Sequence, residues 1–160
     1  MTGRTYVVLG AHRSGTSFLS RSLIEMGVDM GAGSNPHFED GRFVACNQAI
    51  IQAAGGTWKE PPAPDRIWVA CDAHADDILK LLDNGRSYWG WKDPRQAVTI
   101  AGWAPYLKEA LDDVYLICIF RRPERVAQSL ARLGQHSDGY GLAQEYARRM
   151  MDGISVFMEL

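Results

Sequence analysis

A short loop near the N-terminus combines the residue types that bind phosphate. Residues 6–9 (YVVL) form an apolar run typical of a buried strand. Residues 11–15 (AHRSG) make a small polar turn, and Thr16 and Ser17 then open a segment whose apolar residues recur at close to helical spacing. The N–H groups of such a loop converge on an anion, and the helix dipole adds to the attraction. The stretch therefore predicts an anion site, with Arg13 as its cation.

The loop has the spacing of a nucleotide-binding P-loop whose lysine is replaced. Gly10 and Gly15 are separated by four residues, as in G-x-x-x-x-G-K-[ST], and Thr16 stands in the place of the lysine. In nucleoside triphosphatases that lysine reaches the β- and γ-phosphates, so its absence argues against ordinary ATP or GTP hydrolysis. The alternative interpretation is an ordinary strand-to-helix turn whose glycines are incidental.

A second basic motif follows the apolar run of residues 114–120 (VYLICIF). Its sequence is FRRPERVAQSL, with Arg121 at the predicted strand end and Ser129 eight residues later on the next helix. Pro123 suits the first turn of that helix. Basic side chains at a helix N-terminus oppose its dipole, which indicates that an anion is expected there. The alternative is a solvated basic face formed with the neighbouring arginines.

Together the two motifs resemble those of the sulfotransferases that use 3′-phosphoadenosine-5′-phosphosulfate (PAPS). GAHRSGTSFL is similar to their 5′-phosphosulfate loop, and a strand-end arginine with a serine eight positions on is similar to their 3′-phosphate motif. The resemblance covers roughly residues 5–133 and implies PAPS as sulfuryl donor, the bisphosphate PAP as product and no metal. It implies that Arg13 contacts the bridging or sulfuryl oxygens. The phosphate-binding residues that it implies are Ser14, Gly15, Thr16 and Ser17 for the 5′-phosphate and Arg121 and Ser129 for the 3′-phosphate.

Sulfuryl transfer needs a base for the acceptor and cations for the leaving group. Arg13 is the first candidate cation, and Lys92 in WGWKDPR is the second. Cytosolic sulfotransferases use a histidine late in a strand before the 3′-phosphate motif, and the corresponding stretch here has none. NPHFEDGRF instead resembles carbohydrate-type and bacterial sulfotransferases, in which a glutamate follows an aromatic residue. We therefore expect Glu39 to be the general base, with His37 and Asp93 behind it; a solvated loop acid is the alternative.

Short apolar runs alternate with segments of helical composition along the chain. This order predicts one α/β domain over residues 1–160, a three-layer P-loop-like fold with a mainly parallel central sheet. The loops after Leu9, Trp91 and Phe120 leave the carboxyl ends of predicted strands, where such sheets bind ligands. Residues 114–120 are expected to be the clearest buried strand. Helices are expected over residues 16–26, 43–54, 67–82 (one or two), 99–111, 123–133 and 142–160.

Composition limits the partners of the chain. A formal net charge of −2 gives no global basic field for nucleic acid, and three scattered cysteines argue against a disulfide framework or zinc site. No apolar run is long enough to span a membrane and no secretory-type leader is present, so we expect a cytoplasmic protein. The expected acceptor is a small molecule or carbohydrate, selected by residues 31–65 and 134–141. The tryptophans are expected mostly in the core, with adenine stacking or an acceptor pocket as the alternative for Trp58, Trp89, Trp91 and Trp103.

Three functions compete at this point. A PAPS-dependent sulfotransferase leads; a P-loop nucleotide or nucleoside kinase-like enzyme and a non-catalytic nucleotide-binding module are the alternatives. The family usually continues well past the 3′-phosphate helix, whereas this chain ends at Leu160. The expectation is either a minimal member or one lacking the family's C-terminal portion. The oligomeric state stays open.

Overall fold

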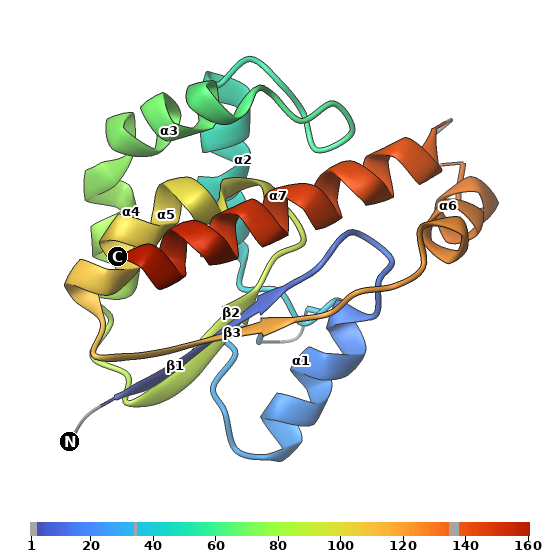
Figure 1. The fold of residues 1–160 in the computed structure, drawn as a ribbon. Coiled ribbons are helices and arrows are strands. Elements are labelled where there is room, and N and C mark those ends of the chain that lie inside the picture. Colours follow the sequence, from blue (N-terminus) through green and yellow to red (C-terminus); the bar gives the residue numbers. More distant parts are fainter. Residues whose placement is uncertain (1–2, 34, 135–137) are drawn as a thin grey trace.

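A parallel sheet of three strands organises the residues that the structure, a computed structural model, describes: 3–33, 35–134 and 138–160. The strand order is β2-β1-β3, and both pairings are parallel. Val8 of the central strand lies opposite Lys92 on one side and Ile117 on the other, so the three strands end at one edge (Figure 1). The elements are β1 (Arg4–Leu9), α1 (Thr16–Glu25), α2 (Gly41–Ala53), α3 (Pro64–Ala73), α4 (Ala75–Leu82), β2 (Tyr88–Lys92), α5 (Gln96–Ala110), β3 (Asp113–Cys118), α6 (Pro123–Arg132) and α7 (Gly139–Glu159).

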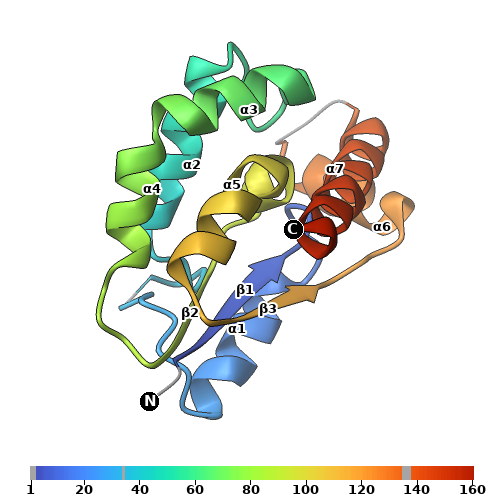
Figure 2. The ribbon, with the colours of Figure 1, turned by 60° about the vertical axis from the view of Figure 1, so that its left-hand side comes forward.

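Helices lie on both faces of the sheet, which gives three layers. Helix α1 lies on one face, whereas α5 and α7 pack together over the other, with α2, α3 and α4 beside α5 (Figure 2). Val7, Val8 and Leu9 of β1 are fully buried because the central strand is covered on both faces. The expectation of an α/β domain is confirmed.

Aromatic side chains fill the core between the sheet and the larger helical layer. Phe43 of α2 stacks on Trp91 of β2 with 4.3 Å between ring centroids, and Trp89 lies 5.4 Å from Trp91. Trp103 of α5 lies 6.0 Å from Trp91 and is also fully buried. These three tryptophans are core residues, as expected for most of the set. Trp58 is half-buried and lies at the site described below.

The predicted helices are present, with ends shifted by a few residues. Helix α2 begins before residue 43 because Asp40 caps it: Oδ1 accepts a hydrogen bond from the N–H of Arg42 at 3.0 Å. The segment 67–82 is two helices, because the chain turns at His74, whose Nδ1 lies 2.8 Å from the Ala70 carbonyl oxygen.

Strand β3 differs from its prediction. The run 114–120 reads as the most buried strand, yet β3 is only half-buried along its length and Tyr115 is 43% exposed. Its end position in the sheet does not by itself explain this exposure, because β2 is the other end strand and is buried. Strand β2 is covered by helices: Trp91 packs against Phe43 of α2 and Trp103 of α5. An apolar run cannot by itself show how much of a strand its neighbours cover.

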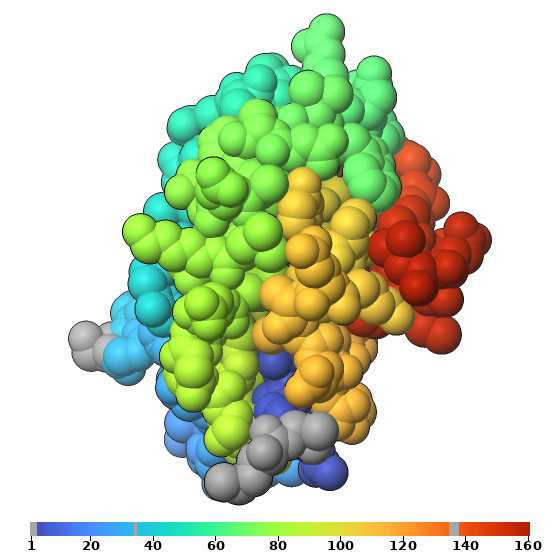
Figure 3. All heavy atoms as spheres, turned by 90° about the vertical axis from the view of Figure 1, so that its left-hand side faces the viewer, coloured from blue at the N-terminus to red at the C-terminus, as the bar shows by residue number. Residues whose placement is uncertain are grey.

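At the edge where the strands begin, the surface is hollowed between residues 79–89 and residues 109–112 (Figure 3). This amino-edge cavity has a volume of about 470 Å³ and lies between the C-terminal ends of α4 and α5. Arg86 lies on its wall, with the guanidinium 4.5 Å above the ring of Trp89. None of the residues predicted to bind the nucleotide phosphates or to catalyse transfer lines it.

Candidate functional site

The loop between β1 and α1 makes a turn that contains two residues in the left-handed region. Arg13 and Gly15 both have left-handed backbone dihedrals, with φ of 66° and 109°. Alternation between right- and left-handed residues turns successive N–H groups toward one side. Gly10 tolerates no side chain, because a Cβ there would lie 2.5 Å from Ile119 and 2.7 Å from the Ser14 hydroxyl. Within the described residues no side chain caps the N-terminus of α1, and the N–H of Phe18 donates to the Gly15 carbonyl at 3.0 Å. The N–H groups of Thr16 and Ser17 precede it and are the ones available to an anion.

The loop and the second basic motif are in direct contact. The Nε of Arg13 donates a hydrogen bond to the Ser129 hydroxyl at 3.0 Å, across 116 positions of sequence. Arg121 Nη1 donates to the carbonyl oxygen of Arg13 at 2.7 Å. Parallel pairing of β1 and β3 explains the contact, because it brings the ends of both strands to the same edge. Arg121 is exposed, whereas Ser129 is half-buried on α6.

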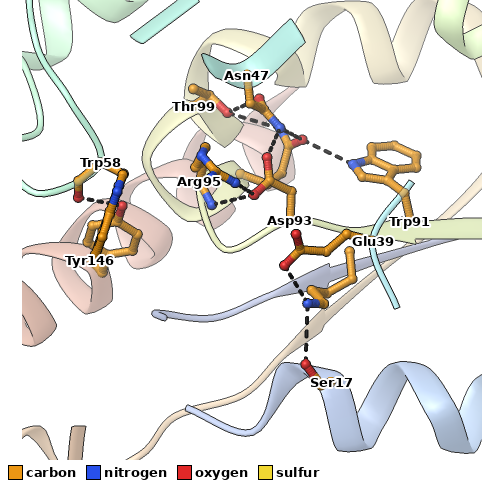
Figure 4. Close-up of polar contacts among 11 residues, drawn as sticks. Ser17, Glu39, Asn47, Trp58, Trp91, Asp93, Arg95, Thr99 and Tyr146 are labelled. Carbon is orange, nitrogen blue, oxygen red and sulfur yellow. Dashed lines mark hydrogen bonds and ion pairs between the residues drawn. The ribbon is translucent and has the colours of Figure 1, made fainter. Parts of the chain in front are cut away.

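Lys92 joins the other side of the loop. It ends β2, and its side chain is 1% exposed. Its Nζ lies 2.7 Å from Glu39 Oε1 and donates more weakly to the Ser17 hydroxyl at 3.4 Å (Figure 4). Burial lowers the pKa of Lys92, and the bonded carboxylate of Glu39 opposes this shift. An ammonium group therefore lies at the start of α1, although Thr16 occupies the position where a P-loop lysine would stand.

The segment before α2 is folded so that Glu39 reaches Lys92. The Asn35 side chain accepts a hydrogen bond from the N–H of His37 at 2.8 Å, and Phe38 takes a left-handed φ of 56°. The Ser17 hydroxyl donates to the His37 carbonyl at 3.2 Å, which holds this segment against α1. Glu39 is 18% exposed, so its carboxylate is accessible from solvent while it is paired.

Asp93 supports the site from behind. It is fully buried, and its two oxygens accept hydrogen bonds from Arg95 Nη1 at 2.8 Å and from Asn47 Nδ2 at 3.1 Å (Figure 4). Gln96 extends this network by accepting from the indole N–H of Trp91 at 3.0 Å. Asp93 therefore fixes the strand-end loop and the orientation of Arg95. Its engaged oxygens make it a poor candidate for the general base, unlike Glu39.

These groups surround a cavity of about 430 Å³, here called the carboxyl-edge cavity. Burial, followed by the positive charges of Arg95, Lys92 and Arg13, lowers the pKa of His12 to about 3, so this imidazole is neutral. Its ring packs 4.4 Å from that of Trp58. Of the predicted site residues, those on the cavity wall are Arg13, Gly15, Thr16, Ser17, Glu39, Lys92 and Arg121, together with the second-choice base His37.

Two of the predicted binding residues lie off this wall, and so does the second-choice base Asp93. The Ser14 hydroxyl is buried and has no hydrogen-bond partner among the described residues, while Ser129 contacts the site through Arg13. Sequence reasoning missed Arg95, which lines the cavity. Arg95 follows Lys92 by three residues in the same strand-end loop, and that position was an available signal. Trp58 also lines the cavity, which agrees with the alternative of a ligand pocket that the sequence left open for it rather than with a core position.

No helix in the described parts of the chain is long and apolar enough to cross a membrane. No group of three or more His, Cys, Asp or Glu side chains there is arranged to hold a metal ion. Residues 135–137, part of a predicted acceptor segment, lie outside the described residues. A comparison with family models, with curated proteins and with solved structures found no match to the chain.

Proposed function

We propose that the chain is a sulfotransferase that moves the sulfuryl group of PAPS to a hydroxyl or amine. One observation carries the proposal: the Arg13–Ser129 hydrogen bond of 3.0 Å joins the two motifs whose resemblance implies opposite ends of one bisphosphate nucleotide. Arg13 and Arg121 also share one cavity. Its volume of about 430 Å³ falls in the range of small-molecule sites.

The residues present fit such a nucleotide. The loop offers uncapped helix N–H groups, the buried Ser14 hydroxyl has no partner among the described residues, and a cavity wall carries four cations. Arg121 would bind the 3′-phosphate, with Ser129 donating its hydroxyl. Both groups now bond to Arg13, so nucleotide binding requires these hydrogen bonds to exchange. Because Arg121 is exposed, that exchange costs little desolvation.

The cavity also holds the groups that transfer needs. Bound PAPS would supply the sulfuryl group and a phosphate leaving group. Arg13 and Lys92 are placed to neutralise charge that develops on the sulfuryl and bridging oxygens. The acceptor oxygen forms a new S–O bond as the bond from sulfur to the phosphate oxygen breaks, and the electron pair leaves with the phosphate. Glu39 takes the acceptor proton.

The Lys92–Glu39 pair also supports a second candidate, a kinase-like P-loop enzyme. Lys92 Nζ lies 3.4 Å from the Ser17 hydroxyl, so a lysine does approach the helix start from another strand. In such an enzyme Lys92 would contact the phosphates of ATP. A preference for magnesium–ATP over PAP would favour this function.

Calorimetric titration of the chain with PAP, with 5′-AMP and magnesium–ATP as controls, tests the proposal. We expect PAP to bind at least tenfold (about 1.4 kcal/mol) more tightly than AMP, because the 3′-phosphate is recognised. Arg121→Ala should remove this preference, whereas Arg125→Ala, an exposed arginine on α6 that bonds only weakly to Gln128 at 3.4 Å, should keep it. Equal affinities for PAP and AMP in the unmodified chain would count against the proposal. PAP binding without turnover on any acceptor would support the non-catalytic module instead.

A further inference from the structure

A second cavity adjoins the carboxyl-edge cavity and shares two of its wall residues. Trp58 and Arg95 line both. The second cavity has a volume of about 370 Å³ and lies between α2 and the loop before α3. We call it the α2-side cavity. The rest of its wall consists of Gln48, Ile51, Gln52, Thr57 and Lys59.

Most residues on the wall of the α2-side cavity carry hydrogen-bonding groups on their side chains. Gln48 and Gln52 are four residues apart, so their amides lie on one face of α2 and offer both donors and acceptors. The loop opposite them is held in place: the Thr57 hydroxyl accepts the N–H groups of Lys59 and Glu60, and Tyr146 donates to the Trp58 carbonyl at 2.8 Å.

The wall is also positively charged. Lys59 and Arg95 line it, and none of its described residues is acidic. The guanidinium of Arg95 is ion-paired with the buried Asp93 through one hydrogen bond, and a guanidinium carries five N–H groups, so donors remain for an anionic ligand. Trp58 adds an aromatic face, with Lys59 Nζ at 5.4 Å from the ring centroid. Amides, one aromatic ring and two cations together match a hydroxyl-rich ring that bears a negative group.

We infer that the α2-side cavity binds the acceptor, and that the acceptor is an anionic sugar such as a uronic acid residue. This inference rests on the proposed function, because the shared residues Trp58 and Arg95 place a ligand in this cavity next to the predicted transfer site. The acceptor hydroxyl would approach Glu39 past Arg95, while the anionic group lies toward Lys59. Residues 31–65, expected to select the acceptor, include all of this wall except Arg95.

Calorimetric titrations of the whole chain, with and without saturating PAP, test the inference. The probes are a glucuronate-containing disaccharide, maltose and p-nitrophenol. We expect the glucuronate disaccharide to bind most tightly. Lys59→Glu should weaken it at least tenfold and change maltose binding less than twofold, whereas Gln52→Ala should weaken both sugars. Lys80→Glu is the matched control, because Lys80 lies on a different cavity at α4.

Tighter binding of p-nitrophenol than of either sugar, or equal effects of Lys59→Glu and Lys80→Glu, would overturn the inference. The same titrations report PAP binding separately. Failure of PAP to bind would count against the proposed function, while the sugar pattern measured without PAP would still decide what the α2-side cavity binds.

Discussion

Two cavities of similar volume lie at opposite edges of the same sheet, about 430 Å³ where the strands end and about 470 Å³ where they begin. Their charges differ. The carboxyl-edge cavity gathers four cations around one carboxylate, whereas the amino-edge cavity has more acidic than basic side chains. The charged residues of the first are Arg13, Glu39, Lys92, Arg95 and Arg121, and those of the second are Asp83, Arg86, Glu109 and Asp112.

The difference follows from the direction of the chain. In a parallel sheet each strand end leads to a helix start, so α1 presents its N-terminus to the carboxyl edge. Helices α4 and α5 end at the amino edge and present their carbonyl groups to the other cavity. Helix dipoles and side-chain charges therefore agree at each edge. The proposed anion site therefore belongs to the carboxyl edge, and the following experiments test whether the two edges differ in this way.

The largest expected effect comes from the single acid of the carboxyl-edge cavity. Glu39→Gln should lower the transfer rate at least 100-fold, about 2.7 kcal/mol, because the amide cannot accept the acceptor proton. PAP affinity should change less than twofold. Glu109→Gln, at the amino edge, is the matched control and should leave the rate unchanged. An unchanged rate in Glu39→Gln would remove this residue as the base.

Stability should respond to pH through the carboxyl-edge cavity. The pKa of His12 is lowered to about 3 in the folded chain, against 6.5 for an ordinary histidine, so the unfolded chain binds the extra proton between these values. The free energy of unfolding therefore decreases as the pH falls below 6.5. Linkage gives a loss of about 2 kcal/mol at pH 5 relative to pH 8. Urea unfolding at both pH values measures it.

His12→Asn should remove most of this pH dependence, and His37→Asn controls for the loss of an exposed histidine from the same cavity. For the His12→Asn chain, the free energy of unfolding at pH 5 is compared with that of the same chain at pH 8, so that any change in overall stability caused by the substitution cancels. If the free energy of unfolding changed by the same amount between the two pH values in both chains, His12 would not be the group that takes up the proton on unfolding.

PAP affinity should depend on cations at one edge only. Arg13→Ala and Arg121→Ala should each weaken PAP at least tenfold, about 1.4 kcal/mol, because each removes a charge-assisted hydrogen bond to a phosphate oxygen. Arg86→Ala removes a cation from the amino-edge cavity and should leave PAP affinity unchanged. Calorimetry gives all three constants. If Arg86→Ala lowered PAP affinity as much as Arg121→Ala does, the proposed difference in anion binding between the two edges would be wrong.

The smallest effect should come from Ser129→Ala. A neutral hydroxyl contributes about 0.5–1 kcal/mol, so PAP should bind about two- to fivefold more weakly. Ser155→Ala, on α7, is the matched control. A tenfold or larger loss would mean that Ser129 acts mainly by orienting Arg13 through their hydrogen bond, rather than by contacting the 3′-phosphate.

The sequence predicts some parts of the carboxyl-edge site better than others. Local spacing was enough for the loop from Gly10 to Ser17, because glycine positions and a helix start are properties of neighbouring residues. Local spacing was not enough for Arg95, and for Trp58 it left a core position and a ligand pocket both open. Their part in the site depends on which loops the sheet brings together, and neither residue has a distinctive local pattern. The exposure of β3 is a similar case, since burial depends on which helices cover a strand and not on the apolar run alone.

By itself the sequence determined the α/β class, the approximate helices and the two basic motifs, because periodicity, glycine spacing and strand-end positions are encoded locally. Tertiary structure alone decided that Lys92 is buried and paired with Glu39 at 2.7 Å, and that Arg13 contacts Ser129. These pairs join residues 53 and 116 positions apart. Only the parallel alignment of β2 and β3 on β1 brings them to one edge, where burial and mutual charge set their chemistry.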